Sequence, residues 1–107
     1  MAIIDGLSPD APVETNAQGG KQSASPYGFH LLPARALFKA ARVVKYGADK
    51  YDESLENRNY LKVPIEQHLN HAICHAYAFL AGDTSDEHIS HFAVRALMAL
   101  EVYLHGS

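Results

Sequence analysis

Two segments of the chain, twenty residues apart, carry the same polar pattern at helical spacing. The first is H-x-x-H-x-x-x-H and the second is H-x-x-H-x-x-x-R. They comprise His68, His71, His75, His88, His91 and Arg95. On a helix, positions i, i+3 and i+7 lie within an arc of roughly 60°, so each triplet forms a stripe along one face. If two such helices turn these stripes toward each other, they build a single polar site.

Each stripe runs along the border of a continuous apolar arc. The arcs comprise Ile65, Leu69, Ala72, Ile73, Ala76, Phe79 and Leu80 in the first segment, and Ile89, Phe92, Ala93, Ala96, Ala99, Leu100 and Tyr103 in the second. Alanine and leucine recur at matching offsets in the two segments. We therefore predict two related helices that form an antiparallel hairpin across the short link 81–85.

The preceding part of the chain divides into an arm and a further helix. Residues 1 to about 30 are rich in Gly, Ser, Pro, Ala and Asn without sustained periodicity, which predicts an N-terminal arm or loop, with residues 31–107 forming the helical domain. A helix should begin near Pro33 and continue toward Gly47 or slightly beyond. The polar and aromatic segment 50–60 is predicted to be a loop with room for one helical turn.

The remaining boundary signals complete an all-α bundle of three to four helices. Pro64 predicts the start of the next helix, and Thr84 or Ser85, followed by Asp86 and Glu87, is expected to cap the last one. No segment shows strand alternation of useful length. Helices from so short a chain often complete their core across a two-fold axis, so we expect a homodimer.

Composition restricts the class of protein. A chain of 107 residues that is 48% hydrophobic forms one domain. Its apolar runs are shorter than the roughly 18 residues of a membrane span, and the first ten residues, with Asp5 and Asp10, do not resemble a signal peptide, so a cytoplasmic location is expected. The lone Cys74 agrees with a reducing compartment. A net charge of −3 argues against general nucleic-acid binding but not against one bound nucleotide.

The densest group of imidazoles and carboxylates is D-T-S-D-E-H-I-S-H at residues 83–91. Imidazole binds zinc, manganese, iron, nickel or copper, whereas magnesium prefers carboxylate oxygen and water. Two imidazoles one turn apart supply one edge of a metal site, and the remaining ligands would come from the opposite helix or from nearby carboxylates. This segment is the first candidate for a metal site.

A purely structural interpretation explains the same residues. Histidines at the border of an apolar face commonly pack half-buried and hydrogen-bond across a helix pair. The basic residues of the first helix are typical of a solvated face, and Asp83 and Asp86 suit turns and caps in many proteins. Tyr46 and Tyr51 would then cover one end of the bundle. From these residues alone both interpretations stay open.

A longer series of motifs resembles a known family. It comprises G-G-K-Q-S at 19–23, L-L-P-x-x-A-L at 31–37, V-V-K-Y-G-A-x-K-Y at 43–51, N-Y at 59–60, the first histidine stripe, L-A-G-D at 80–83 and H-x-x-H at 88–91. In order and spacing, the series is similar to the phage-associated family named for the dATP/dGTP diphosphohydrolase N-terminal region, across residues 19 to 104.

The resemblance implies a helical hydrolase that depends on a divalent metal and converts dGTP or dATP to the monophosphate and pyrophosphate. In some phages this activity contributes to nucleotide-pool remodelling, which would place the protein in the host cytoplasm. The metal would be magnesium or manganese, or zinc or another ion that prefers imidazole. Its partners would be a purine deoxynucleotide and a second copy of the chain.

Residue roles follow from this resemblance. Asp86, Glu87 and His91 would be the catalytic groups. Metal ligands would come from His71, His75, Asp83, Asp86, His88 and His91. Lys21, Arg35, Lys50 and Arg95 would approach the phosphates, and Tyr46, Tyr51 or Tyr60 would stack on the purine.

The chain differs in one respect from the all-α pyrophosphohydrolases of the MazG type, which this family resembles, and the difference leaves other functions open. The all-α pyrophosphohydrolases of the MazG type carry E-x-x-E on one helix and E-x-x-D on the next, whereas a histidine stripe occupies the first position here and comparable carboxylates occur only at Asp83, Asp86 and Glu87. The alternative functions are a small phage helical module that binds a nucleotide or protein without turnover, and a bundle that a metal such as zinc stabilises.

Overall fold

The computed structural model describes Ile4 and residues 7–51 and 54–106, and it divides the chain into two compact units, 1–32 and 33–107. The first unit contains a β-hairpin and ends in a short 3-10 helix, η1 (Phe29–Leu31). The second unit contains three α-helices. The predicted class, a small helical domain, is therefore confirmed for the described residues.

Periodicity did not predict the hairpin in the first unit. Strand β1 (Val13–Thr15) pairs antiparallel with β2 (Lys21–Ser23). Asn16 holds the connecting loop, because its side-chain oxygen accepts hydrogen bonds from the backbone N–H groups of Gln18 (3.0 Å) and Gly20 (2.9 Å). Strands of three residues are too short to show alternation. The two strands were therefore not predicted, while the all-α class holds for the described residues.

The helices of the second unit begin where the prolines place them. Helix α1 (Ala34–Tyr51) starts one residue after Pro33 and runs past Gly47, and α2 (Ile65–Leu80) starts directly after Pro64. Helix α3 (His88–His105) completes the unit, and the 3-10 turn η2 (Asn59–Lys62) precedes α2. None of these helices, within the described residues, is long and apolar enough to cross a membrane.

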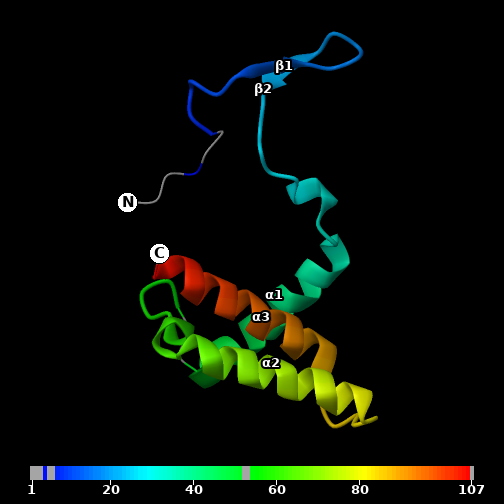
Figure 1. Cartoon of the computed structure of the whole chain (residues 1–107), viewed down its shortest axis with the longest axis vertical. Coiled ribbons are helices and arrows are strands. Elements are labelled where there is room, and N and C mark those ends of the chain that lie inside the picture. The colour runs from blue at the N-terminus through cyan, green and yellow to red at the C-terminus, as the bar shows by residue number, and fades with distance from the viewer. Residues whose placement is uncertain (1–3, 5–6, 52–53, 107) are drawn as a thin grey trace. The chain divides into compact units, whose positions relative to one another are not determined.

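Helices α2 and α3 pack side by side as a hairpin, and α1 packs against α3 (Figure 1). The chain leaves α2 through Gly82, whose φ of +85° suits glycine, and the backbone N–H of Asp83 donates to the carbonyl of Ala78 at 3.0 Å. Helix α3 begins later than expected. Neither Thr84 nor Ser85 caps it, and Glu87 at the N-cap position makes no side-chain cap hydrogen bond, so that prediction was wrong.

The interior of the second unit consists of small and polar side chains from all three helices. The buried apolar residues are Ala40, Ala72, Val94 and Ala99, and the buried polar residues are His68 and His88. Most large members of the two apolar arcs are exposed instead, including Ile73 (52%) and Leu100 (52%). The histidine stripes therefore do not border the core as predicted. Their buried members belong to it.

His68 is fully buried, with 0% of its surface exposed. Its ring Nε2 lies 2.8 Å from the backbone carbonyl oxygen of Tyr60, which can only accept, so the imidazole donates this bond. The contact fastens the turn η2 to the first half of α2. His68 thus stabilises the packing of η2 against α2.

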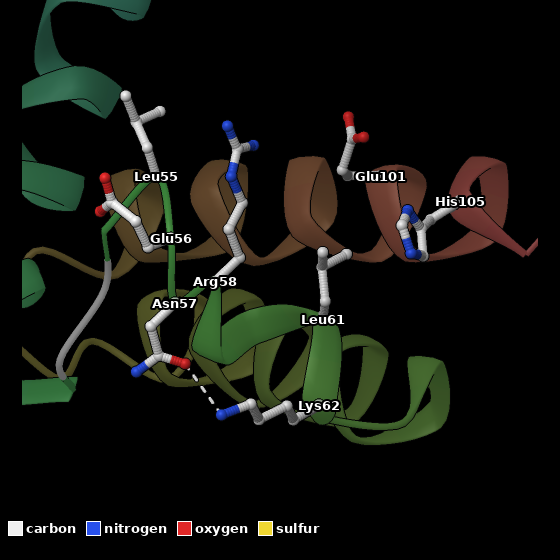
Figure 2. A pocket seen from close by; sticks show the side chains of 8 residues that line it. All are labelled: Leu55, Glu56, Asn57, Arg58, Leu61, Lys62, Glu101 and His105. Atoms are coloured by element: carbon white, nitrogen blue, oxygen red, sulfur yellow. Dashed lines mark hydrogen bonds between the residues drawn. The ribbon is translucent and has the colours of Figure 1, made fainter. Parts of the chain in front are cut away.

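A pocket of about 430 Å³ lies beside the end of α3 (Figure 2). It is lined by Leu55, Glu56, Asn57, Arg58, Leu61, Lys62, Glu101 and His105. At about 1.5 Å per residue, His105 lies about 25 Å along the helix from His88. This pocket is therefore separate from any site at the start of α3.

Candidate functional site

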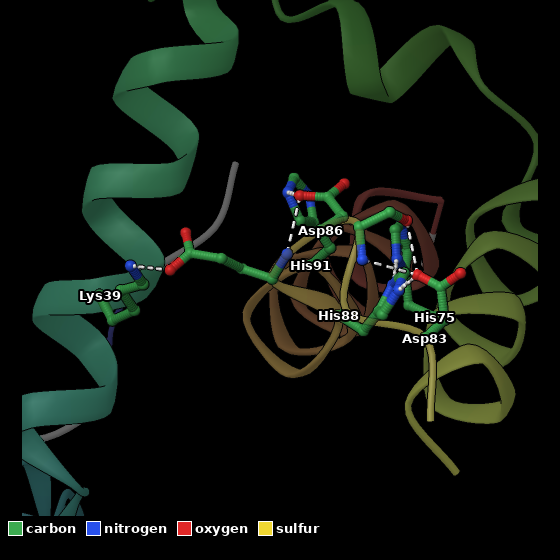
Figure 3. Close-up of polar contacts among 8 residues, drawn as sticks. Lys39, His75, Asp83, Asp86, His88 and His91 are labelled. Atoms are coloured by element: carbon green, nitrogen blue, oxygen red, sulfur yellow. Dashed lines mark hydrogen bonds and ion pairs between the residues drawn. The ribbon is translucent and has the colours of Figure 1, made fainter. Parts of the chain in front are cut away.

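Three histidines meet where α2 ends and α3 begins (Figure 3). His75 comes from the last turns of α2, and His88 and His91 come from the first turn of α3. The ring centroid of His75 lies 5.2 Å from that of His88 and 5.0 Å from that of His91. The hairpin therefore joins members of the two predicted stripes into one imidazole cluster.

Asp83 determines which nitrogen of His88 carries a proton. Its Oδ1 lies 2.8 Å from His88 Nε2, and a carboxylate oxygen accepts, so Nε2–H is the donor. In the neutral ring, Nδ1 of His88 then carries the lone pair. This nitrogen lies 2.9 Å from Nδ1 of His75, which must be the donor of that contact. The result is a chain of hydrogen bonds from Asp83 through His88 to His75.

The Asp83 carboxylate is itself held in place by the turn that precedes α3. Its Oδ1 also accepts hydrogen bonds from the backbone N–H and the side-chain hydroxyl of Ser85. These bonds, with that from His88, hold the pKa of Asp83 well below its usual value. The carboxylate is therefore charged at neutral pH and remains an acceptor for His88.

A second carboxylate pairs with the third imidazole. Asp86 Oδ1 lies 3.3 Å from Nε2 of His91 and accepts a hydrogen bond of 2.8 Å from the backbone N–H of Glu87. That backbone bond is the main reason that the pKa of Asp86 lies below its ordinary value. Glu87 turns toward α1, where it pairs with Lys39 at 2.6 Å. A cation from α1 is thus linked to the start of α3 (Figure 3).

His75 resists protonation in this setting. Burial lowers its pKa below 6.5, and the neighbouring His91 and His88 lower it further, while Asp86 opposes them. His71 adds a small effect in the same direction as the other imidazoles. The folded state therefore favours the neutral His75 ring.

We expect the metal-free protein to lose stability as the pH falls from about 7.5 to about 5. Between the lowered pKa of folded His75 and its unfolded value near 6.5, the unfolded state binds more protons, so acidification favours unfolding. Asp83 stabilises the fold over a different pH range. Its contribution to the free energy of unfolding is present above its unfolded pKa of 3.8 and is lost only as the pH falls below that value. Urea denaturation at the two pH values measures the effect. If the His75→Gln variant loses as much stability between these two pH values as the wild type does, His75 is not the group responsible.

Arg95 continues the second stripe one turn beyond His91. Its Nε is buried and has no hydrogen-bond partner in the described part of the chain. Burial is also the main cause that lowers the pKa of its guanidinium, against an opposing effect of Tyr51. A buried donor that lacks a partner is costly unless a ligand or water satisfies it. Arg95 is therefore a candidate contact for an anion.

The other predicted site residues do not join the cluster. His71 is exposed on α2, and Arg35 and Tyr46 are exposed on α1. Lys50 lies over the ring of Tyr51, with Nζ 5.2 Å from its centroid. Lys21 is in the first unit, where it donates to the hydroxyl of Thr15, and the hydroxyl of Tyr60 accepts from Arg58.

Lys39 and Ser85 are functional candidates that spacing did not reveal. Lys39 lies 48 positions before its partner Glu87, and no local pattern connects them. Ser85 was expected to cap a helix, but it holds Asp83 instead. Only the tertiary arrangement identifies these two roles.

The donor set suits a divalent transition metal in chemistry, because imidazole and carboxylate are both good ligands. Among the described residues, however, no three side chains of His, Cys, Asp or Glu converge in a way that would hold an ion. Within the cluster, the two Nδ1 atoms of His75 and His88 lie 2.9 Å apart. The residues that the structure describes therefore bring these two nitrogens together without forming a complete ligand shell.

Comparison with known proteins adds one finding. A family model described as dATP/dGTP diphosphohydrolase, N-terminal, matches residues 16–107. No curated protein and no solved structure matches the chain significantly. The matched range contains all three helices and the whole imidazole cluster.

Proposed function

Because the chain belongs to the family dATP/dGTP diphosphohydrolase, N-terminal, we propose that it hydrolyses dGTP or dATP to the monophosphate and pyrophosphate. The observation that supports this proposal is the cluster of His75, His88 and His91, with Asp83 and Asp86 hydrogen-bonded or ion-paired to its rings. Carboxylate–imidazole pairs of this kind supply a proton acceptor of defined orientation.

In the proposed reaction, a water oxygen bonds to the α-phosphorus while the bond from this phosphorus to the α,β-bridging oxygen breaks. Pyrophosphate leaves with that oxygen. The water proton passes to an imidazole, for which His91 is the best placed candidate. Nε2 of His91 faces the Asp86 carboxylate at 3.3 Å, so a proton held on this nitrogen would leave the lone pair on Nδ1 to receive the proton from water.

Cations of the chain would stabilise the triphosphate. Arg95 presents a buried Nε without a partner in the described residues, and Lys39 is paired with Glu87, the residue directly before α3. Charge-assisted hydrogen bonds to phosphate oxygens would satisfy Arg95 and offset the developing negative charge. A divalent ion at His75 and His88 would supply Lewis-acid stabilisation of the same oxygens.

The activity is tested by incubating the full chain with each of the four deoxynucleoside triphosphates and with magnesium, manganese or zinc. We expect the purine substrates to yield monophosphate and pyrophosphate in equal amounts, as measured by chromatography. Absence of monophosphate under every metal condition would overturn the proposal, as would release of single phosphates.

We also propose that a second copy covers the exposed apolar side chains of α2. Leu69, Ile73, Tyr77 and Leu80 follow one helical stripe and are 45% to 76% exposed. Among the described residues only four apolar side chains are buried, so covering this stripe would add apolar burial that a domain of this size needs for stability.

Light scattering after gel filtration is expected to give a mass of about twice 11.7 kDa for the wild-type chain. Ile73→Glu places a charge in the covered stripe and should shift the protein to the monomer. Leu55→Glu, a matched change at an exposed leucine outside α2, should leave the dimer intact. A wild-type monomer at high micromolar concentration would refute the dimer.

A further inference from the structure

Two buried side-chain atoms lack a hydrogen-bond partner among the described residues, Nδ1 of His68 and Nε of Arg95. One is an acceptor and the other a donor. Because Nε2 of His68 donates to the carbonyl of Tyr60, Nδ1 of the neutral ring carries the lone pair, whereas Nε of an arginine always carries a proton. The two atoms are therefore complementary, and each would cost free energy if it stayed unbonded in the interior.

The register of the hairpin places these two residues at the same level of the interface between α2 and α3. His75 and His88 meet across this interface, with 2.9 Å between their Nδ1 atoms. His68 lies seven residues before His75 and Arg95 lies seven residues after His88, so in an antiparallel pair both steps run in the same direction. Seven residues are nearly two helical turns, which return a side chain to within about 20° of the same face. The pair therefore repeats the arrangement of His75 and His88, about 10 Å farther along the interface.

The interface at this level is buried and carries small side chains. His68 has no exposed surface, and Ala72 and Ala99, each four residues after one member of the pair, are only 3% exposed. Neither unpartnered atom reaches a described protein group directly. A buried water molecule commonly satisfies polar atoms of this kind. One water can donate to Nδ1 of His68 and accept from Nε–H of Arg95 at the same time.

We propose that one buried water molecule joins Nε–H of Arg95 to Nδ1 of His68, and that His68 is thereby the positioning residue for the Arg95 guanidinium. The carbonyl of Tyr60 completes the series, because its bond to Nε2 fixes which nitrogen of His68 accepts. The proposal rests on the proposed function only in naming a phosphate group as the ligand of the guanidinium.

The consequence for binding follows from the shape of the arginine side chain. Nε is buried, but Arg95 as a whole remains partly exposed, which leaves the terminal nitrogens as the part of the group that can meet a ligand. A guanidinium is planar, so fixing Nε also fixes the plane in which the terminal nitrogens direct their protons. A phosphate then binds a side chain that has already lost much of its rotamer freedom, which lowers the entropic cost of binding.

Two substitutions of His68 separate the roles of its two nitrogens. His68→Gln can retain an N–H donor for the carbonyl of Tyr60, but it has no acceptor at the position of Nδ1. His68→Asn has the reverse property, because its shorter side chain presents an acceptor oxygen near the position of Nδ1 and does not reach Tyr60. We expect His68→Asn to lose more stability toward urea, and His68→Gln to release Arg95. Circular dichroism checks that each variant is helical.

The first measurement needs no nucleotide and follows the side-chain Nε–H signals of the arginines in nitrogen-15 spectra of the full chain. Arg95→Lys identifies the signal of Arg95, since lysine has no such group. We expect this proton to exchange with solvent more slowly than those of the exposed Arg35 and Arg42, and to show a nuclear Overhauser contact to a bound water. His68→Gln should accelerate the exchange about tenfold, the effect of one lost charge-assisted hydrogen bond.

The second measurement follows dGTP hydrolysis. His68→Gln should raise KM about tenfold with little change in kcat, because a loosened Arg95 weakens phosphate contacts in the ground state and the transition state alike. In the Arg95→Lys background, the same substitution should have no further effect. His105→Gln is the matched control at an exposed histidine of α3, and its KM and kcat should equal those of the wild type.

A wild-type Arg95 proton that exchanges as fast as that of Arg42 would overturn the proposal without any variant at His68. An unchanged exchange rate in His68→Gln would also overturn it, as would a KM effect of this substitution that persists in the Arg95→Lys background. These outcomes are distinct from failure of the proposed function. Faster exchange in His68→Gln, in a chain that hydrolyses no nucleotide, would reject the activity alone, and hydrolysis of dGTP with equal exchange rates would reject the bridge alone.

Discussion

Replacement of His91 by alanine is expected to lower pyrophosphate release from dGTP by about 100- to 10,000-fold, the usual contribution of a positioned acid–base group. The substitution removes the ring that Asp86 orients at 3.3 Å, and with it the proposed acceptor of the water proton. Because His91 is only partly buried, the fold should tolerate its loss. Single-turnover rates at saturating substrate measure the effect on the chemical step.

His105→Ala is the control for this experiment, since His105 is an exposed histidine at the far end of α3. Its rate should match that of the wild type. A His91→Ala variant that keeps its helicity and most of its rate would remove His91 from the mechanism. Comparable loss in both variants would point to a general effect of altering α3.

Replacement of His68 by alanine is expected to lower the free energy of unfolding by about 3 kcal/mol, through a lost buried hydrogen bond and a cavity. His68 has no exposed surface, and its Nε2 donates to the carbonyl of Tyr60 at 2.8 Å. For a chain with so small a core, this loss is a large share of a total of about 5–15 kcal/mol. Urea denaturation followed by circular dichroism measures it.

His71→Ala provides a control on the same helix, one turn away. His71 belongs to the same sequence stripe but is exposed, so its removal should change stability by less than about 0.5 kcal/mol. If both substitutions lower the free energy of unfolding equally, the difference in burial between His68 and His71 does not determine their contribution to stability. The comparison therefore tests the division of the first stripe into a structural and an exposed member.

The helices themselves were predictable because their signals are local. Pro33 and Pro64 each precede the first helical residue, and the repeated stripe correctly identified α2 and α3 as a pair. The cluster was predictable in part for the same reason, since i, i+3 spacing places His88 and His91 on one face. Helical periodicity is a property of the backbone and needs no tertiary information.

The orientation of the helices was not predictable from the same pattern. A helix with an apolar arc and a polar border can pack either of these two faces against its neighbour. In α2, Ala72 and His75 face α3, while Ile73 stays exposed. Periodicity shows that faces differ but not which face meets the same chain and which meets another molecule. The hairpin at residues 13–23 and the Lys39–Glu87 pair were missed because short strands and distant contacts leave no repeating signal.

The interface between α2 and α3 limits which substitutions can stabilise this chain without removing its imidazole cluster. Its imidazoles occupy positions that leucine would fill in an ordinary bundle, and leucines there would strengthen the packing while removing every ring of the cluster. Selection for greater robustness and selection for chemistry therefore act on the same few positions in opposite directions. A stabilised variant is best sought on α1 or in the first thirty residues, where additional packing need not displace a reactive group.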